Sequence, residues 1–164
     1  MELSGPTPIA SLVESARASG RARFVQSCPP YLLIVQTPAC AGSDLASTAI
    51  DARVVASAEW GVVGVSKRPN ANGFPEMITI GRGRNNDIWL PSLGVSKFHA
   101  YVTRGQTAAC LVDAGSTTGT FYEGQRLRPH TRVPLRSGAR VQIGDLEGFY
   151  LSREDFYDQR IVEA

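Results

Sequence analysis

The sequence of 164 residues contains few of the residues that mark several large classes of protein. Its three cysteines, Cys28, Cys40 and Cys110, do not form a metal-spaced pair, and their odd number argues against a disulfide framework. Only two histidines are present, and no apolar run approaches the length of a membrane span. We therefore expect no metal, no cofactor and no membrane partner.

An excess of charge is also missing. The 17 Lys and Arg residues nearly balance the 15 Asp and Glu residues, and the net charge of +2 is too small to predict a nucleic-acid partner. Residues 1–15 lack the basic stretch and the long apolar segment of a secretory signal. These features and the unpaired cysteines predict a cytoplasmic protein. The length of the chain is sufficient for one domain that buries its own core.

An apolar stripe with helical spacing predicts a helix near the N-terminus, which Thr7 caps, Pro8 begins and Gly20 ends. The stripe consists of Ile9, Leu12, Val13 and Ala16. A further short helical turn is predicted at residues 21–28. We expect the stripe to pack on the rest of the domain, near a second helix that Ser152 caps at the C-terminus.

Short apolar runs dominate the rest of the sequence, and turn residues separate them at a spacing of about 8–12 residues, which is typical of an all-β sandwich or barrel. The predicted strands cover residues 31–37, 61–67, 76–81, 86–90, 98–103, 108–113, 119–124, 139–144 and 147–152. Residues 38–59 fit either a helix or a loop that leads into a strand. The expected organisation is an extension of helix and strand at 1–59, an all-β sandwich of antiparallel and mixed strands at 60–151, and a C-terminal helix at 152–164.

Residues 81–87, GRGRNND, combine glycine and arginine as a phosphate-binding loop does. A dinucleotide-binding loop would need a third glycine and a following helix, and a P-loop would end in Gly-Lys-Ser/Thr; neither pattern is present. A hydrolytic triad of Ser96, His99 and Asp113 depends on geometry, but no Gly-x-Ser-x-Gly motif surrounds Ser96. We therefore expect a binding protein and no enzymatic activity.

Four short motifs follow one another along the all-β segment. They are Gly81-Arg82, then Asn86-Asp87-Ile88, then Ser96 with His99, and finally Asp113, Gly115, Ser116, Gly119 and Thr120. Together, over about residues 77–146, they resemble the forkhead-associated (FHA) domain, a phosphothreonine-peptide reader. The resemblance implies a β-sandwich whose loops at one end form the binding site.

The resemblance also implies roles for individual residues. Arg82 would hold the phosphate, and the hydroxyls of Ser96 and Thr117 would donate to it. Lys97 would add charge or contact the peptide backbone, and Thr118 would lie where the family contacts the peptide main chain. Gly81, His99, Ser116 and Gly119 would support the site. The implied partner is a phosphothreonine-containing protein, either a Ser/Thr kinase or the substrate of one.

The sequence departs from the family pattern at two positions. Thr118 stands where the family usually has asparagine, and Ala139 stands where it usually has aspartate in the final turn. Because of Thr118, a second hypothesis is a phosphate-independent protein-interaction or scaffold module on the same fold. The arginines of residues 126–140 fit either a solvated surface or a secondary patch for acidic partners.

Overall fold

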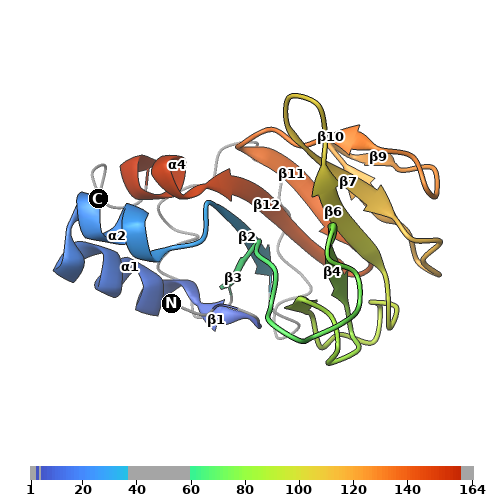
Figure 1. Cartoon of the computed structure of the whole chain (residues 1–164), viewed down its shortest axis with the longest axis horizontal. Helices are drawn as coiled ribbons and strands as arrows, with labels where there is room; N and C mark the ends of the chain where they lie inside the picture. Colours follow the sequence, from blue (N-terminus) through green and yellow to red (C-terminus); the bar gives the residue numbers. More distant parts are fainter. Residues whose placement is uncertain (1–2, 4, 37–59, 160–164) are drawn as a thin grey trace.

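Two β-sheets face each other in the computed structural model, which describes residue 3 and residues 5–36 and 60–159 (Figure 1). The larger sheet has the strand order β1-β3-β2-β12-β11-β8-β9, and the smaller has the order β10-β7-β6-β4-β5. The strands are β1 Thr7–Pro8, β2 Tyr31–Gln36, β3 Trp60–Gly64, β4 Met77–Gly81, β5 Ile88–Trp89, β6 Ala100–Arg104, β7 Ala109–Asp113, β8 Thr120–Tyr122, β9 Gln125–Arg126, β10 Val133–Pro134, β11 Ala139–Ile143 and β12 Leu146–Ser152.

The pairing of the strands confirms the predicted fold class, a sandwich of antiparallel and mixed strands. Every pair among the described strands is antiparallel except β4 with β5, which run parallel. Strand β2 lies between β3 and β12, so the N-terminal part of the chain contributes a strand to the larger sheet. The proposed boundaries near residues 60 and 152 stay predictions.

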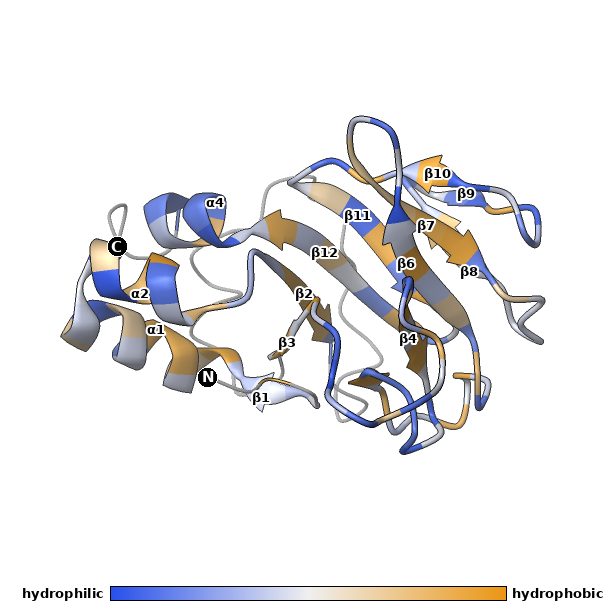
Figure 2. Ribbon diagram, viewed as in Figure 1, coloured by the Kyte–Doolittle hydropathy of each residue, from blue (hydrophilic) through white to orange (hydrophobic). Residues whose placement is uncertain are grey.

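Two apolar layers explain why β2 is apolar almost throughout. Leu33 and Val35 point between the sheets, whereas Leu32 and Ile34 point to the opposite face of the larger sheet. Because helices cover that outer face, both sides of the strand are buried. Strand β11 has only one buried face, and apolar and polar residues alternate along it (Figure 2).

Three helices pack together on the outer face of the larger sheet (Figure 1): α1 Ile9–Ser19, α2 Arg21–Ser27 and α4 Arg153–Tyr157. The predicted apolar stripe of α1 is buried in one cluster with residues of β2, β3 and β12, and Phe24 of α2 stacks on Phe156 of α4. The stripe of α1 and Phe156 of α4 thus belong to one buried cluster. None of the helices in the described part of the chain is long and apolar enough to span a membrane.

The predicted start of α1 was wrong. Thr7 and Pro8 form β1, which pairs with Val62 and Gly61 of β3, and Pro8 stands at the N-cap without a side-chain capping bond. Pro8 has extended backbone angles, φ −52° and ψ 129°, so the helix begins one residue later, at Ile9. Two other helix ends follow the prediction: Gly20 terminates α1 at φ 74°, and Ser152 Oγ accepts from Asp155 N at 3.0 Å. The C-terminal helix, predicted to extend to residue 164, ends at Tyr157, and residues 160–164 lie outside the described residues.

The predicted strands are present, but several of their ends are corrected. Strand β6 begins at Ala100 instead of residue 98, and β8 stops at Tyr122 instead of residue 124. Strand β3 stops at Gly64 instead of residue 67, and β5 is confined to Ile88–Trp89, because the residues before it belong to a hydrogen-bonded loop. Strands β9 and β10 were not predicted, since each has only two residues and is defined by its pairing with β8 or β7. The alternatives for residues 38–59 lie outside the described residues.

Candidate functional site

Three loops meet at the end of the sandwich where β4 stops and β6 begins. They are residues 82–87 after β4, residues 90–99 before β6 and residues 114–119 after β7. Arg82 N donates to Ser96 O at 2.9 Å, and Thr117 N donates to Ser96 Oγ at 3.1 Å. The structure therefore brings together the three residues that the sequence assigned to one phosphate, on the side of the molecule away from the helices (Figure 1).

The guanidinium of Arg82 is held at one nitrogen only. Its Nε donates to Val95 O at 3.1 Å, while the side chain as a whole is exposed. Among the described residues, none accepts a hydrogen bond from either terminal nitrogen, and no carboxylate pairs with the group. The fork of Arg82 is thus oriented by the protein and has donors left for an anion.

Ser96, Lys97 and Thr117 also have unused donors. Ser96 Oγ accepts from the Thr117 amide, so its own proton remains for a ligand. Lys97 and Thr117 are exposed, and within the described chain the Lys97 ammonium and the Thr117 hydroxyl have no hydrogen-bond partner. Together with Arg82 they place four groups able to donate to an anion on adjoining loops.

The backbone of Lys97 fixes the loop that carries Arg82. Its carbonyl accepts from Gly83 N at 3.0 Å and from Asn86 Nδ2 at 2.6 Å, and Asn86 Nδ2 also donates to Gly83 O at 2.7 Å. A Cβ atom on Gly81 would overlap the same Lys97 oxygen. Only glycine permits this approach, and Asn86, which the sequence had not assigned to the site, closes the loop.

His99 joins two of the loops from beneath. It is fully buried; its Nδ1 accepts from Ser96 N at 2.9 Å and its Nε2 lies 3.0 Å from Gly119 O. Since Nδ1 accepts, the proton resides on Nε2 and is donated to the Gly119 carbonyl. Burial lowers the pKa of His99, which agrees with a neutral ring that holds the loops together.

Asp113 organises the loop after β7. Its carboxylate accepts from the amides of Gly115 and Ser116 at 2.9 and 3.1 Å and from the hydroxyls of Ser116 and Thr120 at 2.5 and 2.6 Å. Burial opposes the charge, but these bonds together lower the pKa of Asp113 below its usual value. Ser116 Oγ in turn accepts from Gly119 N at 3.1 Å, which closes the turn.

These contacts also show that Ser96, His99 and Asp113 are not arranged as a hydrolytic triad. The imidazole of His99 meets the backbone amide of Ser96, not its hydroxyl, and its other nitrogen meets a carbonyl instead of Asp113. A triad needs the base on the nucleophilic hydroxyl and the carboxylate on the base. Instead, His99 and Asp113 fix the loops, and the hydroxyl proton of Ser96 is not engaged by either of them.

Comparison with known proteins agrees with this geometry. The FHA domain family model matches residues 78–144. The chain is 34% identical over 103 residues to the oxoglutarate dehydrogenase inhibitor of Corynebacterium diphtheriae, covering 60% of this chain and 70% of that protein. The chain belongs to the FHA domain family.

Two further likenesses extend the comparison. The transcriptional regulatory protein EmbR of Mycobacterium tuberculosis is 31% identical over 103 residues, which are 61% of this chain and 26% of EmbR. The chain thus spans about a quarter of that relative's length. The crystal structure of the FHA domain of the CT664 protein from Chlamydia trachomatis matches 74% of this chain and 96% of its own, with a TM-score of 0.50 and 17% identity, and supports the fold.

Thr118, at the position where FHA domains usually have asparagine, braces two loops of this FHA domain. Its Oγ1 donates to Gly94 O at 2.6 Å, and a Cβ on Gly144 would lie 3.1 Å from the same Oγ1. Since the single hydroxyl proton is used within the protein, only the lone pairs of Oγ1 can take part in a contact with a peptide.

The role of the buried residue Asp87 was not predicted from the sequence. Its carboxylate accepts from Lys67 Nζ at 2.8 Å, from Arg68 N at 2.9 Å and from Asn72 Nδ2 at 3.2 Å, and it also accepts from the amide and hydroxyl of Thr79. Burial opposes its charge, yet these bonds lower the pKa of Asp87. Asp87 therefore ties the β3–β4 loop to the loop that carries Arg82; the motif Asn-Asp-Ile marked the position but not these partners.

Proposed function

We propose that this FHA domain binds a phosphothreonine-containing segment of a partner protein in Ser/Thr-kinase signalling. FHA domains are phosphothreonine-binding modules of such signalling. The partner would be a Ser/Thr kinase or the substrate of one, and the binding would take place in the cytoplasm. In this proposal Arg82 and Lys97 neutralise the phosphate, the hydroxyls of Ser96 and Thr117 donate to it, and Thr118 contacts the peptide main chain.

One observation carries the proposal: the unpaired donors of Arg82 stand beside Ser96 and Thr117 on a framework whose own hydrogen bonds are satisfied. A phosphate dianion needs several charge-assisted donors at once. A loop that is already fixed gains these bonds without the loss of entropy that ordering would cost. The shallow, exposed position of the donors fits a phosphate on the surface of a peptide better than an enclosed nucleotide.

Substitution of Arg82 tests the proposal. We expect Arg82→Ala to weaken binding of a phosphothreonine peptide at least tenfold, because a hydrogen bond to a charged group contributes roughly 1.5–3 kcal/mol. The peptide is chosen by screening an oriented library in phosphothreonine, phosphoserine and unmodified forms. Arg84→Ala is the matched control, since Arg84 is two residues away on the same loop and its guanidinium lies 4.8 Å over the Trp89 ring.

Two results would refute phosphate recognition at this site. The first is an Arg82→Ala variant that binds the phosphopeptide as tightly as the parent. The second is a parent that binds phosphorylated and unmodified peptides equally, which would establish the phosphate-independent interaction module. A normal melting temperature of both variants ensures that the loss reflects the site and not the fold.

A further inference from the structure

A groove lies between the two sheets at the end of the sandwich opposite the three loops of the candidate site. The turn that joins β6 to β7, residues 105–108, borders the groove on one side, and Pro30 and Tyr31, where β2 begins, border it on the other. In Figure 1 this turn is at the top of the view, whereas the loops after β4 and before β6 are at the lower right. The groove has a volume of about 720 Å³. We call it the far groove.

The floor of the far groove is apolar and aromatic. Val65, Ile78 and Val102 contribute aliphatic side chains, and the rings of Tyr31 and Tyr150 stack with their centroids 5.0 Å apart and their planes 17° from parallel. Because β2 and β12 pair directly, the two rings are held on neighbouring strands. Tyr31 is 38% exposed, so its ring is accessible to a ligand in the groove.

Tyr150 carries a polar atom that the described part of the chain leaves without a partner. The residue is only 3% exposed, yet its hydroxyl makes no hydrogen bond to any described residue. Buried tyrosine hydroxyls usually have a partner, because an unpaired polar group costs free energy. Burial raises the pKa of Tyr150, so the hydroxyl keeps its proton and can donate it.

The position of the Tyr150 ring shows from which side a partner must come. On the core side, the ring belongs to a cluster of aliphatic side chains from both sheets, which offer no hydrogen-bond acceptor. On the other side, the ring lines the far groove. Tyr122 is different, because its hydroxyl accepts from Arg136 N at 3.2 Å. An acceptor for the Tyr150 hydroxyl therefore has to enter through the groove.

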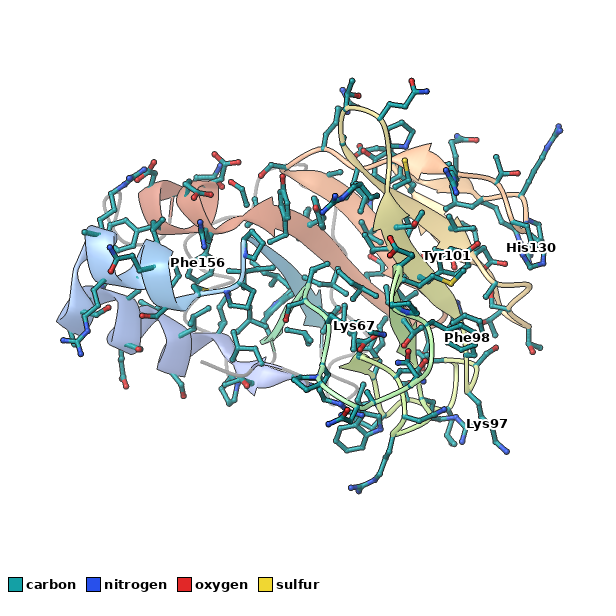
Figure 3. All side chains as sticks on the ribbon, in the orientation of Figure 1. Lys67, Lys97, Phe98, Tyr101, His130 and Phe156 are labelled. Atoms are coloured by element: carbon teal, nitrogen blue, oxygen red, sulfur yellow. The ribbon has the colours of Figure 1, made fainter. Side chains whose placement is uncertain are left out.

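The charged groups on the rim of the far groove favour a neutral ligand. Lys67, labelled in Figure 3 apart from Lys97 of the candidate site, uses all three of its donors within the protein, on Asn72 Oδ1, Met77 O and Asp87 Oδ2. Glu76 and Arg104 are exposed and have opposite charges. Their charges cancel, so the rim attracts neither anions nor cations strongly.

The size and shape of the far groove favour a small molecule as its occupant. Small-molecule sites are concave, have volumes of about 300–1,000 Å³ and combine apolar walls with a few placed polar groups. The far groove has these properties, with the Tyr150 hydroxyl as the placed polar group. A flat aromatic ring fits beside the Tyr31 ring, since aromatic pairs attract each other beyond the burial of their surfaces.

We propose that the far groove binds a small neutral aromatic molecule whose hydrogen-bond acceptor takes the proton of the Tyr150 hydroxyl while its ring packs beside Tyr31. This site is separate from the phosphate donors of Arg82, Ser96 and Thr117. It does not depend on the proposed function, and either can fail without the other.

Three small probes test the two parts of the inference on the full chain. Acetophenone has an aromatic ring and a carbonyl acceptor, ethylbenzene has the ring without the acceptor, and cyclohexyl methyl ketone has the acceptor without the aromatic ring. Amide chemical shifts are followed by NMR during each titration. We expect acetophenone to bind most tightly, with weak affinity because it has few atoms, and to shift the amides of Val65 and Gly105 but not those of Arg82 and Ser96.

Tyr150→Phe isolates the hydroxyl because it keeps the ring. Its affinity for acetophenone should fall about two- to tenfold, to the level of ethylbenzene, while its affinity for ethylbenzene stays that of the parent. Its melting temperature should not decrease, since the lost hydroxyl has no partner in the described protein. Tyr122→Phe is the matched control: it also removes a tyrosine hydroxyl but lies outside the lining of the groove, and it should bind all three probes as the parent does.

Three results would overturn the inference. The first is the absence of shifts at Val65 and Gly105 with acetophenone up to its solubility limit. The second is a parent that binds acetophenone and ethylbenzene equally, which would show an apolar surface without a role for the hydroxyl. The third is a Tyr150→Phe variant that still prefers acetophenone as the parent does, which would place the acceptor on another group.

Discussion

Exchange of Thr118 for asparagine, the residue that FHA domains usually have at this position, tests how the threonine affects binding of a phosphothreonine peptide. The Thr118 hydroxyl donates its one proton to Gly94 O at 2.6 Å. An asparagine amide has two N–H donors and a carbonyl acceptor. Thr118→Asn can therefore keep the bond to Gly94 and still offer one donor and one acceptor to the main chain of a bound peptide.

The magnitude follows from the hydrogen bond that asparagine can add. Threonine offers a peptide only an acceptor, so the exchange adds about one neutral hydrogen bond, worth roughly 0.5–1.5 kcal/mol. Affinity for a phosphothreonine peptide should rise about two- to tenfold.

Calorimetric titration of the parent and Thr118→Asn with one phosphothreonine peptide and its unmodified twin measures the effect. Affinity for the twin should stay undetectable, since the phosphate donors of Arg82, Ser96 and Thr117 are unchanged. Thr118→Val is the control: it keeps the shape, removes the bond to Gly94 and should weaken binding a few-fold. If asparagine does not raise the affinity and neither protein distinguishes the two peptides, the reasoning is refuted in favour of phosphate-independent binding.

Two further predictions concern the framework. Because burial lowers the pKa of His99, the unfolded chain binds a proton on this residue more readily than the folded chain. The contribution of His99 to stability is therefore complete above about pH 6.5 and is lost as the pH drops through the lowered pKa. The melting temperature of the unliganded parent should decrease between about pH 7.5 and 5 more than that of His99→Asn, and equal decreases in the two proteins would contradict this mechanism. Deletion of residues 1–20 should lower the melting temperature markedly, since it uncovers the larger sheet and removes four large buried side chains, Leu3, Ile9, Leu12 and Val13, worth about 1.5–3 kcal/mol each. An unchanged melting temperature would show that α1 does not stabilise the domain.

The spacing of apolar residues was sufficient to predict the helices and strands that bury one regular face. The stripe of α1 and the apolar runs of β2 and β12 appear in the structure at their predicted places. Short elements failed for a common reason: β1, β9 and β10 have two residues each, and long-range pairing, not local pattern, defines them. Thr7 and Pro8 have the local chemistry of a helix start, but pairing with β3 keeps both residues extended.

The candidate site was predictable only as far as its motifs extend. The motifs located Arg82, Ser96 and Thr117, and the structure brings these residues together. They could not reveal Asp87 as the centre of a network with Lys67, because those residues are 20 positions apart and no pattern links them.

The contrast between saturated and unsaturated polar groups distinguishes the site from its support. The buried carboxylate of Asp113 accepts hydrogen bonds from three residues, and both ring nitrogens of His99 are engaged. Within the described chain, the terminal nitrogens of Arg82 and the ammonium of Lys97 have no partner, although they stand next to these groups. A framework that satisfies its buried polar atoms gains nothing in stability from rigid, unpaired cations at its surface. We propose that an anionic ligand explains their placement.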